Sequence, residues 1–262
     1  MTSTYPTLTA SGMGARITDR RITDFSATEI RELVARYRWL AFTGNPVSVD
    51  EMIDYLPRFG PLTENDRRQG PVLKIDASKK DEGEVLLGQG FLPLHRDGVL
   101  MGYDIELVAI CCAEHQDVRG GRTFITDIEN GCKEVPAEIL DLLHERGIEG
   151  RPVDRYYTKP SDTWHWIPGF TELDGQRWLS LGFPYRPDEK PSWLLRIPGV
   201  DDARTQEIFE LMRAVLMSET YCYYHDWQEG DVLLLDNRRT LHGREAFTGG
   251  PRRLANLQVL AR

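Results

Sequence analysis

The sequence predicts a mainly β protein with flanking helices, built around a jelly-roll core. From about residue 70 the chain becomes a series of short apolar runs separated by turn residues, which is typical of strands in a barrel or sandwich. The first 60 residues instead carry helix signals, and no Pro-, Gly- or Ser-rich linker divides the chain. We therefore expect a single domain over residues 1–262, with a helical lead-in at about 26–60 and an insertion at about 135–225.

Four segments have the start signals or the periodicity of helices. Ser26 and Ser48 each begin a Ser-x-x-Glu capping box, followed by apolar residues at helical spacing. Residues 136–147 open with a proline and end at a glycine, and residues 203–217 place their apolar side chains on one face. We expect all four helices to pack on the outside of the β core.

The strands are predicted from short apolar runs bounded by turn residues. The run "WLAF" (39–42) is predicted to be a buried strand between the first two helices. The other predicted strands are "PVLKI" (71–75), "EVLLGQG" (84–90), "FLPLH" (91–95), "ELVAICCAE" (106–114), "RTFITD" (122–127), "DVLLLD" (231–236) and "RRLANLQVLAR" (252–262).

Charge and composition argue against several kinds of partner. The net charge is −9 and no block of Lys or Arg offsets it, so neither a nucleic acid nor an anionic membrane is an expected partner. No window is apolar enough for a transmembrane span, and the first residues do not resemble a signal peptide. The four cysteines lack C-x-x-C spacing, which favours a reduced, cytoplasmic protein. The oligomeric state is not predicted.

The stretch "LPLHRDG" (92–98) places a histidine and a carboxylate two residues apart at the end of an apolar strand. Residues i and i+2 of a strand face the same side, so His95 and Asp97 would point together. Such a pair can bind a metal, act as an acid and base, or form a surface ion pair. A second pair of this spacing, His115 and Asp117, lies in a polar stretch and is predicted to be a solvated loop.

A third candidate ligand, His242, follows the apolar run of "DVLLLDNRRTLHGREAF" (231–247). Two histidines and one carboxylate without a fourth protein ligand form a facial triad, which leaves positions open on iron(II) for a chelating co-substrate and O₂. Arg252 and Arg253 follow soon after, and an arginine suits the far carboxylate of 2-oxoglutarate because it binds carboxylates in a bidentate manner. A hydroxyl such as that of Thr123 could share this carboxylate.

Taken together, these motifs resemble the taurine dioxygenase/clavaminate synthase-like group of iron(II)/2-oxoglutarate oxygenases, over nearly the full length of the chain. Within that group the chain is most similar to the carbapenem synthase branch. The resemblance implies a double-stranded β-helix core (a cupin-like jelly roll). The stretches that carry it are "ASGMGARI", "GFLPLHRDG", "GGRTFITD" and "YCYYHDWQEGDVLLLDNRRTLHGREAF".

The resemblance also implies the cofactors and the role of each matching residue. Iron(II) would be the metal, with 2-oxoglutarate and O₂ as co-substrates that yield succinate and CO₂. Only one arginine of the 252–253 pair can face inward because strand side chains alternate, and Arg253 is favoured. The halogenating relatives have a small residue in place of the Asp97 carboxylate, so halogenation is not expected. The implied ligands are His95, Asp97 and His242 for iron, and Thr123, Arg253, Arg252 and Arg244 for the co-substrate.

The predicted function is oxidation of a C–H bond in a small amino-acid-derived or cyclic secondary metabolite, by hydroxylation, desaturation or ring modification. Aromatic, cationic and neutral polar residues in the expected mouth of the barrel suit a small molecule with an anionic group and some ring surface. The candidate substrate contacts are Arg244, Tyr157, Trp166, Tyr185, Trp193 and Asn256.

Three alternatives to this function stay open. A degradative oxygenase of a sulfonate or aryloxy acid would be expected to have a second cation four residues beyond the co-substrate arginine, where this chain has Asn256 or Leu257. A non-catalytic jelly-roll protein would bind a small molecule without turnover and would not need the arginines. A hydrolytic enzyme could use the same two histidines and aspartate to bind zinc, and would turn over without O₂.

Overall fold

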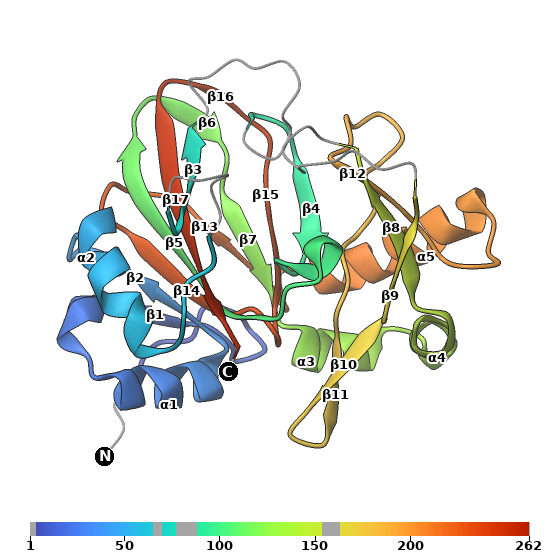
Figure 1. Cartoon of the computed structure of the whole chain (residues 1–262), viewed down its shortest axis with the longest axis horizontal. Helices are drawn as coiled ribbons and strands as arrows, with labels where there is room; N and C mark the ends of the chain where they lie inside the picture. The colour runs from blue at the N-terminus through green and yellow to red at the C-terminus, as the bar shows by residue number, and fades with distance from the viewer. Residues whose placement is uncertain (1–3, 65–69, 77–87, 154–162, 262) are drawn as a thin grey trace.

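The computed structural model describes residues 4–64, 70–76, 88–153 and 163–261, and its core contains two main β-sheets (Figure 1). Neighbouring strands in the larger sheet are far apart in sequence, as expected when a chain winds repeatedly between two sheets. In spatial order this sheet contains β1 (Ala15–Ile17), β2 (Trp39–Phe42), β14 (Val232–Asp236), β5 (Ile105–His115), β17 (Arg252–Leu260) and β3 (Val72–Asp76).

The smaller sheet has four strands and faces the larger one. Its strands pair in an antiparallel manner, and residues from the middle and last thirds of the chain lie side by side. In spatial order they are β13 (Cys222–His225), β7 (Thr123–Thr126), β15 (Leu241–Arg244) and β4 (Leu92–His95). The predicted double-stranded β-helix is confirmed.

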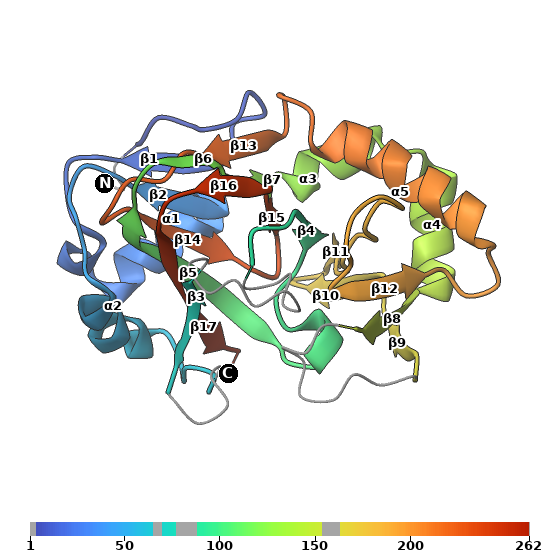
Figure 2. The same cartoon turned by 90° about the horizontal axis from the view of Figure 1, so that it is seen from above.

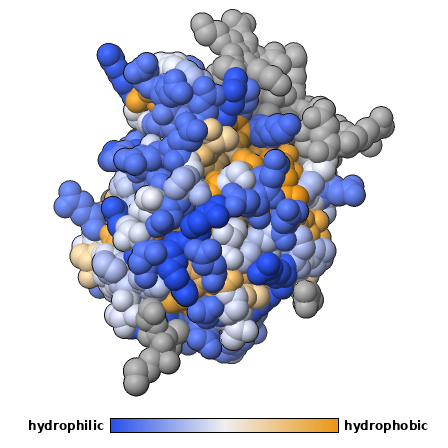
Figure 3. Space-filling model, turned by 90° about the vertical axis from the view of Figure 1, so that its left-hand side faces the viewer, coloured by the Kyte–Doolittle hydropathy of each residue, from blue (hydrophilic) through white to orange (hydrophobic). Residues whose placement is uncertain are grey.

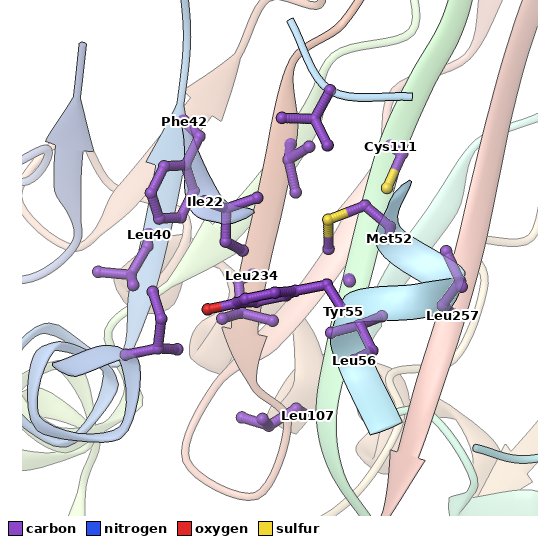
Figure 4. Packing of buried hydrophobic residues seen from close by; sticks show 14 of the residues in the cluster. Ile22, Leu40, Phe42, Met52, Tyr55, Leu56, Leu107, Cys111, Leu234 and Leu257 are labelled. Atoms are coloured by element: carbon purple, nitrogen blue, oxygen red, sulfur yellow. The ribbon is translucent and has the colours of Figure 1, made fainter. Parts of the chain in front are cut away.

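The predicted helical lead-in covers the outer face of the larger sheet. Helix α1 (Ala27–Tyr37) and helix α2 (Val49–Tyr55) begin at the predicted serines, and both capping boxes are formed. The short helix η2 (Leu56–Arg58) continues α2. Figure 4 shows side chains of α2 and η2 packed toward Leu234 of β14 and Leu257 of β17. The strands under these helices are therefore buried on their outer face.

The central strands of the larger sheet are buried on both faces. On β5, Leu107, Ala109 and Cys111 pack under the helices, whereas the alternate residues Val108 and Ile110 belong to a separate cluster between the two sheets. The side chains of β17 alternate in the same way, with Ala255 and Leu257 under the helices and Leu254 between the two sheets. The interior of the barrel is thus lined by one face of each strand.

The chain between β7 and β13 packs against the smaller sheet and builds a second core there. Figure 2 shows its helices α4 and α5 on the opposite side of the molecule from α1 and α2. The sequence predicted both helices but none of the short strands between them. In chain order the elements are α3 (Ile128–Gly131), η4 (Cys132–Glu134), α4 (Ala137–Arg146), β8 (Ile148–Pro152), β9 (His165–Ile167), β10 (Phe170–Leu173), β11 (Gln176–Leu179), β12 (Trp193–Arg196) and α5 (Asp202–Leu216).

Four small elements complete the described fold. Strands β6 (Val118–Gly120) and β16 (Phe247–Gly249) pair with each other, and the short helices η1 (Ile22–Asp24) and η3 (Val99–Met101) lie in loops. Of the strand predicted at 84–90, residues 84–87 lie outside the described part of the chain, and residues 88–90 form no strand.

One face of the molecule is largely polar. Figure 3 shows a predominantly hydrophilic face, with hydrophobic residues gathered beside the grey atoms at the upper right. Among the described residues, no helix is long and apolar enough to cross a membrane.

Candidate active site

The three predicted metal ligands meet on the smaller sheet. His95 is the last residue of β4, Asp97 follows two residues later, and His242 lies opposite His95 in the pairing of β15 with β4. Asp97 Oδ1 lies 3.2 Å from His95 Nε2 and 3.7 Å from His242 Nε2. The two imidazole rings are 4.5 Å apart, centroid to centroid. The structure therefore brings together the two histidines and the carboxylate that the sequence singled out.

The geometry of these side chains fits a metal ion. One ligand atom from each residue lies within 4.8 Å of the other two, and two donors bound at right angles to an ion are roughly 3 Å apart. His95 Nδ1 lies 2.8 Å from the Pro93 carbonyl oxygen, to which it can donate, and this leaves the Nε2 lone pair directed at the site. Two imidazoles and one carboxylate are the donor set of an iron(II) facial triad.

The ionisation of the candidate ligands also suits metal binding. Burial opposes the charge on Asp97, but His242 and His95 hold the pKa of this carboxyl well below its usual range. Burial, with the neighbouring His95 as a smaller cause, lowers the pKa of His242 to about 4. At neutral pH the aspartate is therefore charged and His242 is neutral, which are the forms that bind metals.

Three amide side chains hold Asp97 in place, and two of them were not predicted from the sequence. Asn256 Nδ2 and Gln258 Nε2 donate to Asp97 Oδ2 at 3.1 and 2.8 Å, which leaves Oδ1 facing the histidines. Asn237 accepts from the Asp97 backbone N–H at 3.0 Å and donates to its carbonyl oxygen at 3.1 Å. Asn256 was predicted as a substrate contact, whereas Gln258 and Asn237 were not predicted.

Replacing Gln258 with leucine is expected to weaken metal binding about 10- to 100-fold, since partners of a ligand typically contribute this much to affinity. Asp97 would keep only one of its two amide donors and would sample other rotamers. Isothermal titration with Mn²⁺ measures the change. Gln228→Leu is a control, because Gln228 is likewise a glutamine but its backbone N–H, not its side chain, makes its contact with Asp231. An unchanged dissociation constant for Gln258→Leu would contradict this role.

The structure corrects the choice between the two arginines at the start of β17. The Arg253 side chain is 53% exposed and forms ion pairs with Glu114 and Asp76 on the outside of the sheet. Arg252 is fully buried and lines the cavity that contains the metal ligands. The prediction that Arg253 is the inward-facing arginine of the pair is therefore wrong, because strand alternation directs Arg252 inward.

Arg252 has the properties of an anion-binding group. Its Nη2 donates to the Gly121 carbonyl oxygen at 2.7 Å, but its buried Nε and Nη1 have no hydrogen-bond partner among the described residues. Burial, and to a lesser degree the charge of Arg244, lower its pKa to about 9. A carboxylate would satisfy both orphaned donors and would neutralise the buried charge.

Arg244 and Thr123 lie beside each other in the same cavity. They are direct partners in the pairing of β15 with β7, and both side chains are buried. Arg244 donates to the Gly90 carbonyl oxygen at 2.7 Å, and burial lowers its pKa to about 10. This end of the cavity thus brings together the buried guanidinium groups of Arg244 and Arg252 and the Thr123 hydroxyl, as the predicted co-substrate site requires.

The glycines of the "GGRT" motif allow Arg252 to approach β7. Gly121 has a φ of +75°, and a Cβ built there would lie 3.1 Å from Arg252 Nε and 3.0 Å from Phe247 Cβ. A larger residue would push the guanidinium out of place. This close approach gives a physical reason for the glycine before Arg122 and Thr123.

The cavity encloses about 1000 Å³, including the part that opens to solvent. Beyond the metal ligands and the arginines, its wall is mainly apolar. Trp193 packs beside His95, with ring centroids 5.4 Å apart, and its indole N–H donates to the Phe183 carbonyl oxygen. The apolar lining residues are Leu73, Ile75, Leu92, Val99, Leu100, Met101, Ile110, Trp193, Leu195 and Leu254.

The other predicted substrate contacts are only partly in place. Trp193 and Asn256 line the cavity, whereas Tyr185 is buried behind Trp193, with ring centroids 5.0 Å apart. Trp166 is 60% exposed and does not line the cavity, so this prediction is wrong: β9 presents its side chain to solvent. Tyr157 lies outside the described residues.

The second His-x-Asp pair is not part of a metal site among the described residues. Asp117 is exposed in a turn with a φ of +51°, as expected for a loop. His115 is the half-buried last residue of β5 rather than a loop residue. The two side chains therefore do not share a strand face, and the His-x-Asp spacing alone does not predict a metal site.

Comparison with known proteins gives a consistent result. Residues 4–258 match the model of the family described as "Taurine catabolism dioxygenase TauD, TfdA family". The chain is 24% identical to tyrosine isonitrile desaturase of Erwinia amylovora, covering 87% of this chain and 79% of that protein. It is also 24% identical to (S)-phenoxypropionate/alpha-ketoglutarate-dioxygenase of Delftia acidovorans, covering 94% of this chain and 89% of that protein.

A solved structure shares the fold. The crystal structure of the PvcB protein from Pseudomonas aeruginosa superposes with a TM-score of 0.71 at 22% identity, covering 95% of this chain and 86% of that one. The family match covers nearly the whole chain, and the His95–Asp97–His242 cluster agrees with it. The chain belongs to the TauD/TfdA family and is an iron(II)- and 2-oxoglutarate-dependent dioxygenase.

Proposed function

We propose that this enzyme oxidises a C–H bond of a small amino-acid-derived or cyclic metabolite that carries ring or other apolar surface. The observation that carries the proposal is that one cavity has a charged, polar part and an apolar part. Arg252 and Thr123 line one part, where they would bind the anionic co-substrate, whereas η3, which begins two residues after Asp97, contributes the apolar side chains Val99, Leu100 and Met101. The substrate would bind against this apolar wall.

The chain's residues bind and orient the reactants. His95, Asp97 and His242 would hold iron(II), which supplies the O₂ chemistry that couples decarboxylation of 2-oxoglutarate to oxidation of the substrate. Arg252 and Thr123 would bind the distal carboxylate of 2-oxoglutarate, with Arg244 beside them. The apolar wall around Trp193 would exclude water from the reacting C–H bond.

The relatives support a substrate with an aromatic ring. One is named for tyrosine isonitrile, an amino-acid derivative, and the other for phenoxypropionate, an aryloxy acid. The second name favours the aryloxy acid alternative. Against that alternative, the residue four positions beyond Arg252 is Asn256, which is neutral and is already bonded to Asp97. The more specific likeness to the carbapenem synthase branch stays a prediction.

A substrate panel tests the proposal. Purified iron-loaded enzyme is given 2-oxoglutarate and O₂ with N-modified aromatic amino acids, cyclic amino-acid derivatives, aryloxy acids or taurine, and succinate formation is measured. We expect an amino-acid-derived compound to raise succinate formation at least about tenfold above the rate without substrate, with one oxidised product per succinate. Faster coupled turnover of taurine or an aryloxyacetate would contradict the proposed substrate class.

A further inference from the structure

One buried hydrogen bond occupies an acceptor lone pair of the Thr123 hydroxyl. The indole Nε1 of Trp227 lies 3.0 Å from Thr123 Oγ1, and both residues are buried. An indole N–H can only donate, so the threonine oxygen must accept in this bond. Because Thr123 also lines the cavity, its own hydroxyl proton is left to donate to a ligand there.

Trp227 is held firmly behind Thr123. It lies in the turn between β13 and β14, and the ring of His225 packs edge-on against its indole at 4.5 Å. His225 in turn lies between two partners, with its Nε2 3.1 Å from Asp231 Oδ2 and its Nδ1 2.9 Å from the Tyr223 hydroxyl. Asp231 also accepts the Gln228 backbone N–H at 3.0 Å, which closes the turn.

Thr123, with Trp227 and His225 behind it, lines the same cavity as Arg244 and Arg252. His225 and Thr123 are direct partners in the pairing of β13 with β7, and Arg244 pairs with Thr123 from the other side. Arg252 reaches the same strand end through the Gly121 carbonyl oxygen. A hydroxyl whose proton is available to donate therefore lies beside two guanidinium groups, which can only donate.

We propose that Trp227 is a positioning residue for the co-substrate, acting through Thr123. By occupying one acceptor lone pair of the threonine oxygen and holding that oxygen in place, it favours the orientation in which the hydroxyl proton donates to the distal carboxylate. The enzyme thereby favours a dicarboxylic 2-oxo acid over a 2-oxo acid that ends in a methyl group. The inference rests on the proposed location of 2-oxoglutarate at Arg252 and Thr123.

The test compares two ligands in anaerobic titrations of iron(II)-loaded protein, followed by the visible absorption of the bound 2-oxo acid and by calorimetry. 2-Oxoglutarate carries the distal carboxylate, and 2-oxopentanoate has a methyl group in its place. We expect Trp227→Phe to weaken 2-oxoglutarate binding about fivefold and to leave 2-oxopentanoate binding unchanged, because a lost hydrogen bond to a charged group costs this much or more. Equal weakening for both ligands, or none for either, would overturn the inference.

A double-mutant cycle separates this inference from the proposed function. In a Thr123→Val background, where no hydroxyl remains to be oriented, Trp227→Phe should have no further effect on 2-oxoglutarate binding. If Thr123→Val alone leaves 2-oxoglutarate binding unchanged, the proposed co-substrate site is wrong. If Thr123→Val weakens binding but Trp227→Phe adds the same loss with or without Thr123, only the role of Trp227 is wrong.

A second variant keeps the test available if Trp227→Phe does not fold. His225→Phe retains an aromatic ring against the indole but removes both hydrogen bonds of the imidazole, so the indole is held less firmly. We expect a loss of about twofold, confined to 2-oxoglutarate. An equal loss of affinity for both ligands in this variant would show that His225 and Trp227 support only the structure of the cavity.

Discussion

Replacing Asp97 with alanine is expected to abolish succinate formation, both with and without a substrate. Asp97 is the only carboxylate of the three-residue metal cluster, and its Oδ1 faces both histidines. The variant would leave two imidazoles and a pair of amides that had been bonded to the lost carboxylate. We expect iron(II) affinity to fall by at least about 100-fold, measured by equilibrium dialysis and by succinate assay.

Asp117→Ala is the matched control for this prediction. Asp117 has the same spacing from a histidine in the sequence, but it lies exposed in a turn outside the metal cluster. Its replacement should leave iron affinity and turnover unchanged. Unchanged turnover in Asp97→Ala, or an equal loss in both variants, would contradict the assignment of Asp97 as a metal ligand.

Replacing Arg252 with methionine is expected to raise the dissociation constant of 2-oxoglutarate about 100-fold. Removing one partner of a buried charge pair typically costs 2–5 kcal/mol or more. Arg253→Met is a close control, because the residues are adjacent but Arg253 lies in exposed ion pairs on the other face of β17. Titration of 2-oxoglutarate into both variants measures the difference. A larger loss in Arg253→Met than in Arg252→Met would show that the arginines are assigned the wrong way round.

The same substitution separates binding from folding. In the absence of a ligand, Arg252 is a buried cation with two unsatisfied donors, and burial disfavours its charge. Methionine has a similar length and no charge, so Arg252→Met should melt at the same temperature as the unmodified enzyme or higher, without co-substrate. A loss of 2-oxoglutarate binding with retained thermal stability would identify Arg252 as a ligand-binding residue rather than a structural one.

The sequence was most informative where one physical rule decides the outcome. The capping boxes at Ser26 and Ser48 predicted both helix starts because a side chain that caps a helix must lie at its N-terminus. His95 and Asp97 were predicted to point together because they follow a strand, and His242 lies opposite His95 in the sheet. These residues come from local patterns that the fold preserves.

The choice between Arg252 and Arg253 shows where such patterns fail. Only one of the two arginines can face the cavity, and alternation does not show which, because apolar residues lie on both sides of the strand: Leu254 alternates with Arg252, and Ala255 and Leu257 alternate with Arg253. Both faces of β17 are in fact buried. The apolar face packs under α1 and α2, and the polar face lines the cavity. Periodicity can identify two faces, but it cannot say which of two buried faces contains the site.

Residues that act through another side chain also could not be predicted from the sequence. Gln258 and Trp227 contact Asp97 and Thr123 across the fold, over distances in the chain that no local spacing encodes. The short strands β8 to β12 likewise depend on their pairing with one another and on packing against the smaller sheet. Their positions follow from tertiary contacts rather than from local propensity.

Oxygen-18 gas supplied to the enzyme with iron(II) and 2-oxoglutarate tests directly whether the three ligands support iron-dependent dioxygenase chemistry. We expect succinate that carries one oxygen-18 atom, formed only when the protein retains His95, Asp97 and His242 and is loaded with iron(II). Mass spectrometry of the succinate measures the incorporation, with the zinc-loaded protein as the control. Turnover that continues without O₂, or that is as fast with zinc as with iron, would contradict the assignment of His95, Asp97 and His242 as ligands of a catalytic iron.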